Sequence, residues 1–89
     1  MKTIFKYPIP VTDEFPFELP KGAKIIAFQT QHEQPCIWVI IDPNSNEKET
    51  RYFYMYGTGH PIENVEALTY IGTTQTAGGV LVWHLFERR

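Results

Sequence analysis

The sequence predicts a small all-β domain, either an antiparallel sandwich or a partly open barrel of about seven short strands. Two observations lead to this fold class. Apolar residues alternate with polar residues or prolines along most of the 89-residue chain, which is the period of a strand. Turn-forming residues separate these segments roughly every eight to twelve residues. No linker or internal repeat divides the chain, so residues 1–89 are expected to form a single domain.

The first two predicted strands carry prolines. Residues 5–11 alternate apolar side chains with Lys6, Pro8 and Pro10, and residues 15–19 repeat the pattern around Pro16. Because proline cannot donate a hydrogen bond to a neighbouring strand, both segments are predicted to lie at sheet edges.

Two later segments are apolar on both faces. Residues 23–31 contain a central apolar run, and residues 36–41 are apolar almost throughout. Such runs are typical of interior strands that are covered on two sides. Since only the turn at residues 32–35 separates them, we expect them to pair as a central hairpin. The segment 42–47, rich in Asp, Asn and Pro, is the clearest loop.

The next predicted strand, residues 51–56, has two different faces. Phe53 and Met55 occupy one face, and tyrosines occupy the other. These tyrosines are Tyr52, Tyr54 and Tyr56. A glycine-rich turn ends this strand.

The remaining chain is expected to add two strands and very little helix. Residues 62–67 are long enough for one short helical turn at most. Strands are predicted at 68–75 and 80–86, and a tight turn at 77–79 joins them.

Charge and cysteine content exclude several functional classes. The formal charge is −2, whereas duplex DNA binders and polybasic membrane-surface proteins depend on Lys and Arg. One cysteine cannot form an internal disulfide, which suits a reducing compartment. With no signal peptide and no apolar run of membrane-spanning length, we expect a cytoplasmic protein that binds neither membranes nor duplex nucleic acid.

The sequence contains no recognisable catalytic or metal-binding pattern. Cys36 begins an apolar strand, and Ser45, the single serine, lies in a turn. The histidines His32, His60 and His84 lack the paired spacing of zinc ligands. We therefore expect no enzyme activity, no metal and no cofactor.

The turn Gly57-Thr58-Gly59-His60 has two interpretations. Successive glycines expose backbone N–H groups that can bind an anion, but the Lys-Ser/Thr of a P-loop is missing. The alternative is that these glycines only turn the corner of a strand. His60, between Gly and Pro, is expected to be accessible and is the first candidate for a ligand contact.

The tyrosine row is the second candidate surface. Tyr52, Tyr54 and Tyr56 would project at roughly 6.5–7 Å intervals, with Arg51 at the start of the same strand. Such a row can stack nucleic acid bases, or it can pack against another protein. Because the chain is acidic, packing or a protein interface is favoured.

Four segments of the chain carry a resemblance to a known family. They are KYPIPVT at 6–12, LPKGA at 19–23, GTGHPI at 57–62 and GGVLVWH at 78–84. Together they resemble a family of small uncharacterised phage and prophage proteins. The resemblance implies a viral or prophage origin, and small accessory proteins of that kind commonly bind host proteins or sequester small molecules.

Two functional hypotheses follow. The first is a small phage or prophage accessory protein that binds a host protein without catalysis. A homo-oligomer, preferably a dimer, is expected because the aromatic residues exceed what one thin core can cover. The alternative is a nucleotide-like ligand at a protomer junction, with residues 57–60 at its phosphate, Arg51 supplying charge, and Tyr54 or Tyr56 stacking on its base.

Overall fold

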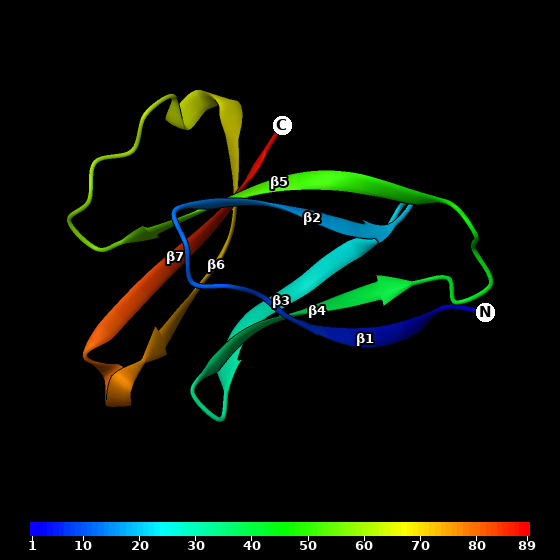
Figure 1. Ribbon diagram of the computed structural model, residues 1–89, viewed down its shortest axis with the longest axis horizontal. Coiled ribbons are helices and arrows are strands. Elements are labelled where there is room, and N and C mark those ends of the chain that lie inside the picture. The colour runs from blue at the N-terminus through cyan, green and yellow to red at the C-terminus, as the bar shows by residue number, and fades with distance from the viewer.

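A computed structural model describes residues 1–89 and shows seven antiparallel strands in two open sheets, with two isolated 3-10 turns (Figure 1). The predicted all-β fold class is confirmed. The elements are β1 (Thr3–Pro8), β2 (Glu14–Pro20), β3 (Lys24–Gln31), β4 (Gln34–Ile41), β5 (Lys48–Gly57), η1 (Val65–Ala67), β6 (Leu68–Thr76), η2 (Ala77–Gly79) and β7 (Leu81–Arg88).

The strand order confirms the predicted edges at the amino end. One sheet has the order β1-β4-β3 and the other the order β2-β5-β7-β6. The two proline-bearing strands, β1 and β2, therefore each lie at an edge of a sheet. There the N–H that proline lacks would point away from the neighbouring strand, so no hydrogen bond of the sheet is lost.

The interior position predicted for residues 23–31 is wrong. These residues pair with β4 as a hairpin, as expected, but β3 is the outer strand of its sheet and β4 alone is central. Of the residues of β3 only Phe28 is buried, and Ile26, at a β-bulge, is 45 % exposed. A three-stranded sheet has a single interior strand, and β4, buried on both faces, occupies it.

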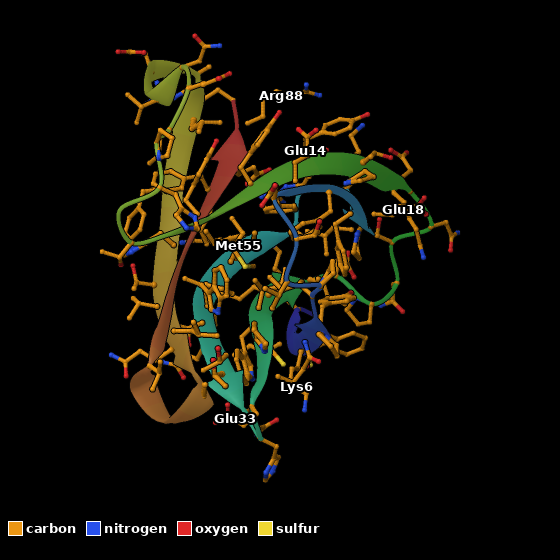
Figure 2. The ribbon with its side chains drawn as sticks, turned by 60° about the vertical axis from the view of Figure 1, so that its left-hand side comes forward. Lys6, Glu14, Glu18, Glu33, Met55 and Arg88 are labelled. Carbon is orange, nitrogen blue, oxygen red and sulfur yellow. The ribbon has the colours of Figure 1, made fainter.

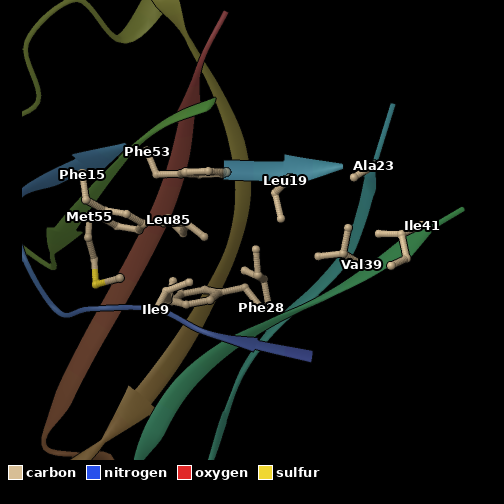
Figure 3. Packing of buried hydrophobic residues seen from close by; sticks show 11 residues of the cluster. Ile9, Phe15, Leu19, Ala23, Phe28, Val39, Ile41, Phe53, Met55 and Leu85 are labelled. Carbon is tan, nitrogen blue, oxygen red and sulfur yellow. The ribbon is translucent and has the colours of Figure 1, made fainter. Parts of the chain in front are cut away.

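The hydrophobic core is one layer of side chains between the two sheets (Figure 3). Phe53 and Leu85 contribute from the four-stranded sheet, and Ile37 and Val39 from β4. Burial of each such side chain contributes about 1.5–3 kcal/mol to stability. The full cluster is Ile9, Phe15, Leu19, Ala23, Phe28, Ile37, Val39, Ile41, Phe53, Met55 and Leu85.

The two sheets approach each other most closely where β3 passes β6. A Cβ atom on Gly72 would lie 3.1 Å from the Cβ of Phe28, so glycine permits this approach. Nearby, the hydroxyls of Thr30 and Thr74 hydrogen-bond at 2.8 Å. The two strands form no ladder, and they cover each other's edges through side chains.

The helical content consists of the two 3-10 turns. η1 occupies residues 65–67, within the segment where one short turn was predicted, and η2 occupies the predicted tight turn between β6 and β7. Neither could cross a membrane, and no helix of the fold is long and apolar enough to do so.

Replacing Gly72 by valine is expected to lower the free energy of unfolding by about 1–3 kcal/mol, because the added carbons overlap Phe28 and push β3 away from β6. Urea denaturation measures the change. Thr69→Val, at an exposed position of the same strand, is the control and should change stability by less than about 0.5 kcal/mol. Unchanged stability in Gly72→Val would contradict the close approach of the two strands.

Candidate functional site

The tyrosine row lies on the outer face of the four-stranded sheet. Phe53 and Met55 point into the core from β5, so the alternating tyrosines point away from it. Tyr52 is 42 % exposed, and Tyr54 and Tyr56 are half-buried. The alternation predicted from the sequence is therefore the alternation that the strand adopts.

Neighbouring strands extend this row into a larger aromatic face. Phe86 of β7 contacts Tyr56 and Tyr70 edge to face, with ring centroids 5.8 and 5.5 Å away. The guanidinium carbon of Arg88 lies 4.0 Å from the ring centroid of Tyr52, a cation–π contact. We call this surface the tyrosine face; its aromatic residues are Tyr52, Tyr54, Tyr56, Tyr70 and Phe86.

Arg51 does not belong to the tyrosine face. Its side chain points to the opposite side of β5 and donates two hydrogen bonds to Glu87, at 2.6 and 2.8 Å. A third bond, 2.6 Å long, goes to the carbonyl of Ala23. The bond to Glu87 raises the pKa of Arg51 and outweighs the opposing effect of burial. Arg51 thus joins β5, β7 and the start of β3, and Arg88 is the cation beside the tyrosines.

The Gly57–His60 turn is closed by its own hydrogen bonds. The N–H of His60 donates to the carbonyl of Gly57 at 3.1 Å, and the N–H of Gly57 donates to Nδ1 of His60 at 3.2 Å. Two of its backbone donors are therefore not available to an anion. The His60 ring folds back over Gly57, where any Cβ would meet it at 2.9 Å.

His84 ties this turn to the sheet, a role that the sequence pattern did not reveal. Its Nε2 hydrogen-bonds the hydroxyl of Thr58 at 2.8 Å, and its Nδ1 that of Thr73 at 3.0 Å. Thr73 in turn bonds the hydroxyl of Tyr70. The alternation of β7 places His84 beside Phe86, and that was the only signal available in the sequence.

Around Tyr54 the outer surface is hollowed into a continuous groove. Three adjoining hollows of about 420, 350 and 390 Å³ share Glu14 and Tyr54 as lining residues. Figure 2 shows Glu14 and Arg88 on the outer side of β5, whereas Met55 points between the sheets. We call this the tyrosine groove; the residues that shape it are Asp13, Glu14, Tyr52, Tyr54, Tyr56, His60, Pro61, Glu63, Asn64 and Arg88.

The tyrosine groove is acidic. It holds the carboxylates of Asp13, Glu14 and Glu63 against one guanidinium, that of Arg88. None of the three carboxylates forms an ion pair within the chain. Burial raises the pKa of Tyr56, and Tyr54 and these carboxylates raise it further. Burial disfavours any charge at this position, but the negative charge of the three carboxylates, which also disfavours a phenolate, attracts a cation.

The titratable residues do not form a metal site. No group of three or more His, Cys, Asp or Glu side chains is close enough to hold an ion. The three histidines lie apart, with His32 in the β3–β4 turn, His60 in the loop after β5 and His84 on β7. Cys36 is buried in β4 and only 1 % exposed.

Comparison with known proteins identifies a family and no activity. The family model described as a domain of unknown function, DUF7352, matches residues 1–89. No curated protein and no solved structure matches the chain.

The placement of Arg51 gives a stability prediction. Arg51→Met leaves the half-buried Glu87 carboxylate and the Ala23 carbonyl unpaired, and should lower the free energy of unfolding by about 3 kcal/mol in urea denaturation. Lys21→Met is the matched control. Its ion pair with Glu47 is exposed and should contribute less than about 1 kcal/mol. Equal losses in the two variants would refute a structural role for Arg51.

Proposed function

The chain belongs to the DUF7352 family, and we propose that it is a non-enzymatic protein-binding domain whose tyrosine groove takes a partner segment presenting an arginine or lysine side chain. The observation that carries this proposal is that half-buried tyrosine rings and three carboxylates without an ion-pair partner line the same groove.

The chemistry of the groove favours a guanidinium. A cation over a tyrosine ring is attracted by the negative face of the ring, and the protein already makes such a contact between Arg88 and Tyr52. Arginine can also form paired hydrogen bonds with a carboxylate such as Glu14 or Glu63. Lysine would neutralise the carboxylates but lacks the planar group that stacks on a ring and forms paired hydrogen bonds.

The tyrosine hydroxyls support a protein partner. In the row on β5, the hydroxyls of Tyr52, Tyr54 and Tyr56 make no hydrogen bond within the chain. Tyrosine presents a large apolar area and one polar atom, and it is enriched among the residues that dominate binding energy at protein interfaces. A peptide backbone crossing the row would find free donors and acceptors.

The biological setting is part of the proposal. The resemblance to small phage and prophage proteins suggests an accessory protein that acts on a host protein in the host cytoplasm. The single buried cysteine is compatible with that reducing compartment.

A nucleotide-like ligand is less well supported. The carboxylates of the groove repel phosphate, Arg51 is bound to Glu87 on the far side of β5, and two N–H groups of the Gly57–His60 turn bond within that turn. A positive thermal shift with nucleotides would favour this alternative over the proposal.

Selection of peptides from a random display library, followed by fluorescence anisotropy, tests the proposed function. Selected peptides should contain arginine or lysine, and their affinity should fall as salt is added. Tyr54→Ala should weaken binding about 30-fold, the effect of a typical interface anchor. The double variant Glu14→Gln/Glu63→Gln should weaken it about tenfold.

Glu18→Gln is the matched control, because Glu18 lies on β2 outside the groove, and it should bind like the original protein. Selected peptides without basic residues, or peptides that bind Tyr54→Ala unchanged, would contradict the proposal.

A further inference from the structure

We propose that the chain forms a two-fold symmetric dimer in which β1 pairs with β1 of a second copy, so that two three-stranded sheets join into one six-stranded sheet. This proposal does not depend on the tyrosine groove, which lies on the other sheet.

Three of the four sheet edges are already protected. The edges of β3 and β6 lie against each other through Phe28, Gly72 and the Thr30–Thr74 hydrogen bond. The edge of β2 carries two prolines in seven residues, which block strand addition. β1 has its only proline at its last residue and pairs with β4 without a bulge. In Figure 1 it borders the molecule, with β4 on one side only.

The backbone of β1 shows which groups remain free. Just after β1, the N–H of Ile9 donates to the carbonyl of Pro35 at 3.1 Å. Because successive residues of a strand aim their polar groups at alternate sides, odd-numbered residues face β4. Ile4 and Lys6 therefore direct N–H and C=O groups at the open edge. Pro8, which lacks an N–H, also faces that edge.

The exposed side chains of β1 and the surface area of the chain favour a second copy that covers β1. Ile4 is 55 % exposed on one face of β1, and Phe5 is 46 % exposed on the other. The whole chain exposes 5866 Å², whereas a monomer of its mass typically exposes about 5,400 Å². The difference, about 470 Å², is smaller than the roughly 800 Å² that a standard dimer buries on each partner. Pairing through β1 would cover the exposed Ile4 and Phe5, which are part of this surface.

Charge selects the register of the pair. In an antiparallel pair centred on Ile4, Lys2 would face Lys6 of the second copy twice, and like charges directly opposite each other are unfavourable. Centring the pair on Phe5 avoids this contact. The two Phe5 rings then meet on the axis, and Ile4 faces Lys6 of the second copy.

Sedimentation velocity across a concentration series tests the dimer. Ile4→Pro removes an N–H at the open edge without removing one that faces β4, and should raise the dissociation constant of the dimer about tenfold or more. Ile4→Ala keeps the N–H and should raise it no more than about threefold. A protein that is monomeric at all concentrations, or an Ile4→Pro variant that dimerises normally, would overturn the proposal.

Cross-linking tests the register in the folded protein. Residues that face each other on the axis as a non-hydrogen-bonded pair have Cα atoms about 4.5 Å apart, within reach of a disulfide. Phe5→Cys should therefore oxidise to a disulfide-linked dimer, and Ile4→Cys should not. The buried Cys36 should stay reduced in both variants. Linkage through Ile4→Cys alone would overturn the Phe5-centred register, and linkage through neither would overturn strand pairing.

Discussion

The structure depends on one constraint: a chain of 89 residues can bury only one layer of side chains between its two sheets. The molecule measures 40 × 31 × 16 Å, and the core cluster fills the space between the inner faces. Every strand except β4 therefore keeps one face outside the core. β5 shows the consequence most clearly, because Phe53 and Met55 stabilise the fold while the alternating tyrosines remain on the surface for other contacts.

The same constraint explains how far the sequence predicted the fold. Period-two alternation or apolar runs bounded by turns identified all seven strands. Proline placed β1 and β2 at the edges, because a residue without an N–H can be recognised in the sequence and cannot donate to a neighbouring strand. The apolar run of β3 was misinterpreted as interior. An apolar run shows that both faces tolerate apolar side chains, but it does not say which strand of a hairpin lies in the middle. That depends on whether β1 pairs with β4 or with β3, which is a tertiary choice.

The candidate site was predictable only in part. Alternation within one strand identified the tyrosine row, and the same alternation puts Arg51 on the core side, away from it. The groove is assembled from β2, β5, the loop after β5 and the end of β7, so Glu14, Glu63 and Arg88 come together only in the folded chain. The contacts of His84 were equally hidden in the sequence, because its two threonine partners lie on different segments of the chain. No spacing rule in a single sequence connects such residues.

The central claim is that one face of β5 holds the fold together, whereas the other face, which we propose serves binding, adds little to stability. Urea denaturation of Met55→Thr and Tyr54→Thr, adjacent positions changed to the same strand-favouring residue, tests this claim most directly. Met55→Thr should lower the free energy of unfolding by about 2–4 kcal/mol, because it leaves a cavity and a buried hydroxyl in the core. Tyr54→Thr should lower it by no more than about 1 kcal/mol, the scale of a cross-strand contact. Comparable losses in the two variants would mean that the tyrosine row is part of the packing that holds the fold, and would contradict the account.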